Sequence, residues 1–205
     1  MVCASQFAIN SVKDITDRHT VAYSTNGSTS DSVLRALIAH HGLKAKPTQT
    51  GGPPGTFTMT MSGQIDIGWS VAPFGLKDLQ AKTIRVLMRG SDVPSMRNQT
   101  VRVEIVNASA LEKRHDVMVR FMRAYRETLD WMYSDPLAVK YYSEHMGMPE
   151  SLVELQRKEF NPKTAMNPDK LSDVDLVMQD AIAGKFLEKP LTQEQLAEFI
   201  KIPPR

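Results

Sequence analysis

The residues best suited to bind a ligand lie in a polar loop close to the start of the chain. Residues 24–30 read Ser-Thr-Asn-Gly-Ser-Thr-Ser and follow the short extended run 21–23. Apolar residues then recur at helical spacing over 33–41, and Gly42 ends that pattern. The start of a helix presents free backbone N–H groups at its positive end, which favours anions. The residues that we expect to contact a ligand there are Ser24, Asn26, Gly27, Ser28, Thr29 and Ser30.

A second candidate lies at Trp69 and Ser70. The stretch 64–70 alternates polar and apolar residues, as a strand does, and these two residues stand at its carboxyl end. Open α/β sheets bind ligands at the carboxyl ends of their strands. Together with the loop at 24–30, this end of the strand would form one wall of a polar and aromatic pocket.

Each candidate also has a purely structural interpretation. Ser28, Thr29 or Ser30 could serve only as the N-cap of the helix that follows, as in most α/β proteins. Trp69 could serve only to pack the core. Local pattern does not choose between these roles.

Residue types that carry catalysis or bind metals are not arranged for either purpose. None of the five histidines pairs with another at the i, i+4 spacing of a helical metal site, and the single Cys3 has no ligands around it. We find no nucleophile elbow, phosphate-loop lysine or dinucleotide fingerprint. Asp66 lacks a partner base. The sequence therefore predicts no catalytic residue, no metal and no cofactor, and a protein that is not an enzyme.

Composition narrows the class of protein further. The 205 residues are 41% hydrophobic and 23% charged, which is typical of a folded globular chain. The net charge of +2 and the lack of any basic run argue against nucleic acid as a partner. No apolar stretch is long enough to span a membrane. The start, Met1–Ser5, has no features of a secretory signal and begins abruptly in what reads as a strand.

Two kinds of element pattern follow one another along the chain. Strands alternate with helices up to about residue 106, which predicts an α/β unit with a mainly parallel sheet. In this part, 49–55 reads as a loop and 100–106 as a strand with one polar face. From residue 109 onward only helices are expected, the longest over 113–133 and another over 169–186. Their large apolar residues need a surface to cover, and the chain encodes no second sheet for them.

Several motifs, in a fixed order, resemble those of a known group of proteins. They are Asp14-Ile15, Val21-Ala22-Tyr23-Ser24, Gly27-Ser28, Leu34, Gly42-Leu43, the run from Met61 to Gly68, the run from Arg120 to Tyr125, Trp131-Met132 and Asp135-Pro136. From about Ser5 onward, the chain resembles the periplasmic solute-binding proteins of ABC importers. The group most similar to it is the nitrate/sulfonate/taurine-binding type, which includes relatives for thiamine pyrimidine precursors.

The resemblance implies the type II periplasmic-binding fold, in which two α/β lobes joined by crossing strands hold the ligand between them. On this basis, residues 1–14 begin the first crossing strand and residues 15–98 form α/β lobe two. Residues 99–205 then contain the return strand and the C-terminal helices of an incomplete lobe one. The chain is thus expected to lack the N-terminal part of the fold.

The resemblance also implies a function and a location. Gly27, Ser28 and Thr29 would bind the anionic or polar group of a ligand, and Trp69 and Ser70 would lie at a second ligand-facing loop. The expected protein is the substrate-binding component of an ABC transporter, with a sulfonate, nitrate, carboxylate or pyrimidine as solute. Its partners would be this small molecule and a membrane permease. Its place would be the periplasm, if the parent protein carries a signal peptide.

Two other functions stay open at this point. One is a pyrimidine-precursor synthase-like enzyme on the same fold, which would need an iron site or a Cys/His cluster. The other is a helical interaction protein without a small ligand, which would associate with a partner or with itself through an exposed apolar face.

Overall fold

The computed structural model describes residues 1–100 and 102–205 and divides them into two compact units. The first unit consists of Met1–Gln99 together with Asp173–Pro190. The second consists of Thr100–Ser172 together with Leu191–Arg205. The assignment of these stretches to the two lobes of a binding protein stays a prediction.

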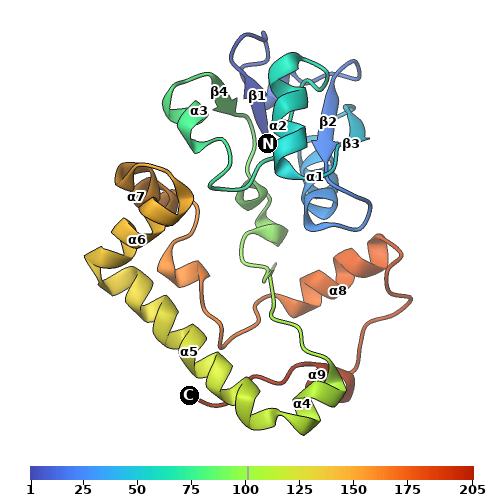
Figure 1. Cartoon of the computed structure of the whole chain (residues 1–205). Coiled ribbons are helices and arrows are strands. Elements are labelled where there is room, and N and C mark those ends of the chain that lie inside the picture. Colours follow the sequence, from blue (N-terminus) through green and yellow to red (C-terminus); the bar gives the residue numbers. More distant parts are fainter. Residues whose placement is uncertain (101) are drawn as a thin grey trace. The chain divides into compact units, whose positions relative to one another are not determined.

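A mixed sheet lies at the centre of the first unit (Figure 1). Its strands are β1 (Val2–Ala4), β2 (Thr20–Tyr23), β3 (Lys46–Gln49) and β4 (Ile84–Val86). β1 pairs antiparallel with β4, and β2 pairs parallel with β3. Residues 67 and 68 join the two pairs, because Gly68 pairs antiparallel with Val2 while Ile67 pairs parallel with Val21. The spatial order is therefore β4, β1, residues 67–68, β2, β3.

The helices α1 (Thr29–His41), α2 (Pro53–Ser62) and α3 (Leu76–Gln80) pack against strands of this sheet, and further helices form most of the second unit. The first unit contains these three helices, α8 (Val174–Ala183) and the 3₁₀ turns Val12–Asp14, Gly90–Asp92 and Pro94–Met96. The second unit contains α4 (Ala108–Lys113), α5 (His115–Ser134), α6 (Pro136–Met146), α7 (Glu150–Glu159), α9 (Gln193–Phe199) and the 3₁₀ turn Lys163–Ala165. The α/β class, with a helical C-terminal part, is thereby confirmed.

The core of the first unit lies between the sheet and α1. Val21 and Ile67 on the sheet, and Leu34 and Leu37 on α1, are completely buried. α1 begins at an N-cap, where the Ser28 hydroxyl accepts a hydrogen bond from the backbone of its third residue, and ends at Gly42 in the left-handed conformation. Both ends of α1 are thus set by local chain chemistry, and its buried face holds the polar loop against the sheet.

Three expectations about single elements need correction. The predicted return strand at 100–106 is wrong over residues 102–106, which have no regular structure and expose Ile105 to 90%. A strand needs backbone partners, and no described segment pairs with these residues, while Val101 lies outside the described part. The predicted loop at 49–55 gives way to α2 from Pro53, since proline at the first helical position loses no hydrogen bond. The helix expected over 169–186 is limited to α8.

The helices of the second unit leave part of their apolar surface open. Leu129 on α5, Val139 on α6 and Leu152 on α7 are buried, whereas Phe121 and Tyr141 are about half exposed. Over the described residues, no helix combines the length and the apolar character that a membrane crossing requires. Nor do three or more metal-binding side chains gather anywhere in that part of the chain.

Candidate functional site

Three strand ends meet at one edge of the sheet in the first unit. Residues 67–68, β2 and β3 run parallel, so their carboxyl ends share that edge. The segments that leave it are the loop 24–30, residues 50–52 and the pair Trp69–Ser70. The backbone N–H of Gly51 donates to the carbonyl of Ser24 at 3.1 Å, which ties two of these segments together. Both sequence-predicted candidates therefore lie at the same edge.

The serines of the polar loop bond to one another. Ser24 Oγ lies 2.8 Å from Ser28 Oγ and 2.9 Å from Ser30 Oγ, and the last two are 3.0 Å apart. Ser30 Oγ also accepts the backbone N–H of Ser24 at 2.8 Å. Asn26 is tied locally as well, since its Oδ1 accepts the Tyr23 hydroxyl at 2.8 Å. These side chains hold the shape of the loop before any ligand arrives.

Asp31 occupies part of the expected anion site. Sequence reasoning did not identify this role of Asp31. Asp31 is 3% exposed, and its Oδ2 accepts the backbone N–H of Gly27 at 2.9 Å. Arg35, one helical turn later, donates to Oδ1 at 2.8 Å and balances the charge. The available signal was an aspartate at the third position of the helix, where a carboxylate favours the positive helix end.

Two backbone donors at the start of α1 keep no partner. The N–H groups of Thr29 and Ser30 make no hydrogen bond within the described part of the chain. They belong to the first helical turn, whose amides have no carbonyl to bond inside the helix. The backbone donors of the loop that are available to an anion are thus the N–H groups of Thr29 and Ser30. Gly27 shapes the loop, but its own N–H is already bonded to Asp31.

Trp69 and Ser70 play different roles at the edge. The indole Nε1 of Trp69 is buried and has no hydrogen-bond partner among the described residues. Ser70 Oγ donates to the carbonyl of Phe74 at 2.9 Å, so it fixes the following turn. A buried indole N–H without an acceptor is uncommon in folded proteins. Of the pair, Trp69 is therefore the residue with an unused donor.

The segment after β3 also reaches the edge, although its composition indicated only a loop. Gly51 adopts the left-handed conformation with φ of 76°, and α2 begins two residues later. Thr50 Oγ1 and Thr56 Oγ1 are 2.6 Å apart, which joins the loop to α2. A strand followed by Gly-Gly-Pro-Pro was the signal for this second helix start.

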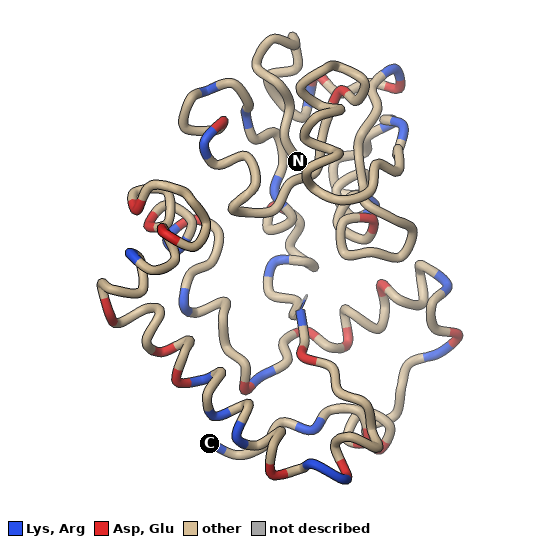
Figure 2. Tube along the Cα trace, viewed as in Figure 1, with Lys and Arg blue, Asp and Glu red and all other residues tan. Residues whose placement is uncertain are grey.

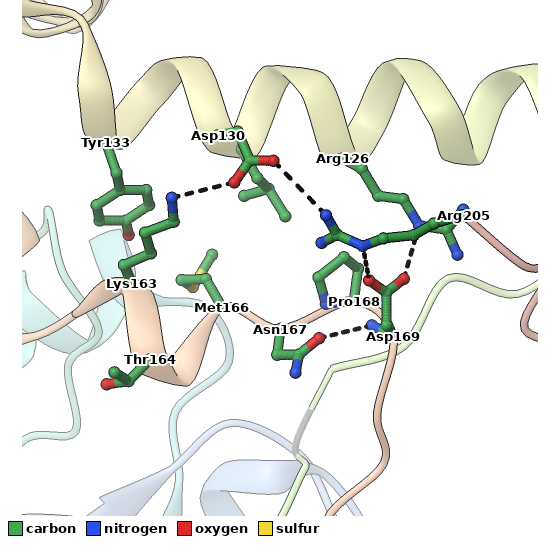
Figure 3. A pocket seen from close by; sticks show the side chains of 11 residues that line it. Arg126, Asp130, Tyr133, Lys163, Thr164, Met166, Asn167, Pro168, Asp169 and Arg205 are labelled. Carbon is green, nitrogen blue, oxygen red and sulfur yellow. Dashed lines mark hydrogen bonds and ion pairs between the residues drawn. The ribbon is translucent and has the colours of Figure 1, made fainter.

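A separate cavity of about 410 Å³ lies within the second unit (Figure 3). It lies between α5, residues 163–169 and Arg205. Arg126 Nε and Arg205 Nε bind the two oxygens of Asp169 at 2.6 and 2.5 Å, while Lys163 Nζ lies 3.0 Å from Asp130. The hydrogen bond from Arg205, with a further one from Arg126, lowers the pKa of Asp169. These charges are paired with each other, which suits a structural network better than a reactive centre.

A family model described as "NMT1/THI5 like" matches residues 1–138. This chain belongs to the NMT1/THI5-like family. No curated protein matches the sequence.

A solved structure has the same fold as this NMT1/THI5-like chain. It is the periplasmic aliphatic sulphonate binding protein SsuA from Escherichia coli, with a TM-score of 0.71 and 20% sequence identity. The match covers 100% of this chain and 65% of the SsuA chain. The NMT1/THI5-like chain thus spans about 65% of the length of that protein. The predicted periplasmic-binding-protein fold is confirmed.

Asp31 stabilises the start of α1 in this NMT1/THI5-like chain by accepting the N–H of Gly27. Replacing Asp31 with alanine leaves the N–H of Gly27 without its acceptor, so we expect the free energy of unfolding to fall by about 1–3 kcal/mol. Urea denaturation measures this change. Arg35→Gln is the matched control: its side chain is 67% exposed, so losing the pair should cost less than about 1 kcal/mol. Equal losses of unfolding free energy for the two variants would contradict the role of Asp31 as the acceptor of the Gly27 N–H.

Proposed function

We propose that this chain is the substrate-binding part of an ABC importer and that its solute is a small anionic or polar organic molecule, with sulfonates first. The observation that carries the proposal is the pair of partnerless amides at Thr29 and Ser30, at the positive end of α1. A sulfonate or carboxylate oxygen supplies the acceptors that these donors lack. Family membership supports the same reading.

The unpartnered indole of Trp69 supports a ligand at the same edge. A buried N–H group without an acceptor costs on the order of 1–3 kcal/mol of stability. A ligand oxygen that accepted this hydrogen bond would remove the cost. The aromatic ring also offers apolar surface beside polar donors, as binding pockets commonly do. Ser24, Asn26, Gly27, Ser28, Ser30 and Ser70 would then act mainly by shaping the loops that carry the donors.

The groups at this edge support a binding role rather than catalysis. The serine hydroxyls of the loop bond to one another, and in the described residues none of them bonds to a histidine or another base. Activated nucleophiles need such a base within hydrogen-bond reach. As a binding component, the protein would work in the periplasm and deliver its solute to a membrane permease.

Replacing Thr29 with proline provides a sharp test, because it removes one backbone N–H and little else. Proline is favoured at the first position of a helix, and the preceding Ser28 already has the extended conformation that proline requires. We expect the 205-residue chain to bind 1-hexanesulfonate and Thr29→Pro to bind it about 10- to 100-fold more weakly, as for one lost bond to a charged group. Isothermal titration calorimetry gives the affinities.

The matched control is Thr29→Ala, which removes the hydroxyl and keeps the N–H. Its affinity should stay within about threefold of the unchanged chain, since no described residue bonds to the Thr29 hydroxyl. Equal affinities of Thr29→Pro and Thr29→Ala would contradict the role of the amide. Failure of the unchanged chain to bind 1-hexanesulfonate, nitrate, a carboxylate or a pyrimidine would contradict the proposed function.

A further inference from the structure

Phe186 reaches the polar loop from a distant part of the sequence. It follows α8, whose last turn continues into a hydrogen-bonded loop within the first unit. The backbone N–H of Phe186 donates to the carbonyl of Ala181 at 2.7 Å, and that of Lys185 donates to Ile182 at 2.9 Å. These hydrogen bonds hold the backbone that carries the Phe186 ring.

Two glycines make room for the ring of Phe186. A Cβ on Gly27 would lie 2.8 Å from Cζ of the ring, and a Cβ on Gly184 would lie 2.7 Å from Cε2. Any other residue type at either position would overlap the ring in this arrangement. Gly27 already has φ of 76°, a conformation that side chains rarely adopt, so the loop has two reasons for a glycine there.

The ring contacts the loop without being buried by it. Phe186 is 61% exposed, although it is a large apolar side chain held against Gly27. Gly27 is two residues from Thr29, the first of the two partnerless amides. An exposed aromatic surface thus lies close to the proposed anion-binding donors. Covering this surface with another apolar group is favourable, because it removes apolar area from water.

We propose that Phe186 determines ligand specificity: its exposed ring covers the hydrocarbon part of a solute whose anionic group binds at the amides of Thr29 and Ser30. The inference rests on the proposed function and deepens it. It assigns the ligand to anions that carry an alkyl or aryl group, and it disfavours small inorganic anions. Phe186 is the residue that separates these two classes.

The test compares 1-hexanesulfonate with methanesulfonate, which share the anionic group and differ in hydrocarbon length. In the unchanged chain, 1-hexanesulfonate should bind more tightly. Phe186→Ala should weaken 1-hexanesulfonate about tenfold and methanesulfonate less than about twofold, because the longer chain has more hydrocarbon to bury against the ring. Phe186→Leu keeps an apolar side chain and should recover part of the loss. Calorimetry measures all affinities, and the melting temperature of each variant is recorded alongside.

The outcomes separate this inference from the function on which it rests. If the unchanged chain binds neither sulfonate, both fail. If it binds both and Phe186→Ala leaves their affinity ratio unchanged, the role of Phe186 fails while the proposed function stands. A residue that only anchors α8 would lower the melting temperature and shift both affinities by the same factor, which also overturns the inference.

Discussion

Replacing Arg126 with methionine is expected to lower the free energy of unfolding of the second unit by about 2–4 kcal/mol, because three hydrogen bonds from a charged group are lost. The Arg126 side chain is 7% exposed, and its guanidinium binds Asp169 at 2.6 Å (Figure 3). It also donates to Pro204 O at 3.1 Å and to Pro203 O at 2.5 Å. Methionine fills similar volume but supplies none of these donors. The variant thus loses the attachment of the C-terminal segment and of residue 169 to α5.

Tryptophan fluorescence can follow this unfolding in one unit alone. Trp131 lies on α5 in the second unit and Trp69 lies in the first, so a Trp69→Phe background reports the second unit during urea denaturation. Arg205→Gln is the matched control, since Arg205 also binds Asp169 but is 62% exposed, and its loss should be much smaller. A loss for Arg126→Met no larger than that of Arg205→Gln would contradict the prediction.

The pH dependence of stability gives a second readout of the same network. The hydrogen bonds from Arg205 and Arg126 lower the pKa of Asp169 in the folded protein. A carboxylate with a lowered folded pKa stabilises the protein above its unfolded pKa of about 3.9, and this stabilisation is lost as the pH falls through the folded value. The advantage of the unchanged chain over Arg126→Met should therefore shrink in that acid range.

Replacing Gly68 with alanine is expected to destabilise the first unit by about 2–3 kcal/mol. The added methyl group would overlap Thr60 Oγ1 and lie 3.4 Å from Thr56 Cγ2. Both threonines are buried on α2, and Thr60 Oγ1 already donates to Thr56 O at 2.8 Å. Gly68 also bonds to Val2 through both backbone groups at 2.8 Å, so the strand cannot move away without breaking the sheet.

Two companion variants make the Gly68 result specific. Gly52→Ala adds the same methyl group where only Pro54 Cδ lies near, at 3.8 Å. Gly52 is the N-cap of α2, where alanine is disfavoured, so the loss of stability should be below about 1 kcal/mol. Combining Gly68→Ala with Thr60→Ala removes Thr60 Oγ1, the atom that the methyl group overlaps most, so the pair should cost less than the sum of the single losses. Additive losses in urea denaturation would show that the predicted overlap is not the cause.

Local patterns predicted those features that neighbours along the chain decide. The start and end of α1, at Ser28 and Gly42, follow from side-chain capping and from the freedom of glycine, both of which act within a few residues. The ordered motifs likewise predicted the periplasmic-binding fold, which the solved SsuA structure confirms. The same reasoning placed the polar loop and Trp69 at strand ends, and the parallel pairing brings those ends to one edge.

Local patterns were misleading wherever a distant partner decides the outcome. Residues 102–106 alternate as a strand does, but a strand forms only when another segment offers its backbone, and none of the described segments does so. In the polar loop, hydroxyl and amide composition indicated many donors for a ligand. The structure uses most of them internally, because short serine side chains close in sequence bond to one another and to neighbouring backbone groups.

The sequence by itself determined the family, the α/β character and the loop at 24–30 as the place to look for a ligand. Only the tertiary structure decided which groups there remain available: Asp31 uses the N–H of Gly27, and the amides of Thr29 and Ser30 are left. It also placed Phe186 against Gly27, across more than half of the chain. The reason is physical: capping depends on adjacent residues, whereas such contacts exist only once the packed core has fixed where distant segments meet.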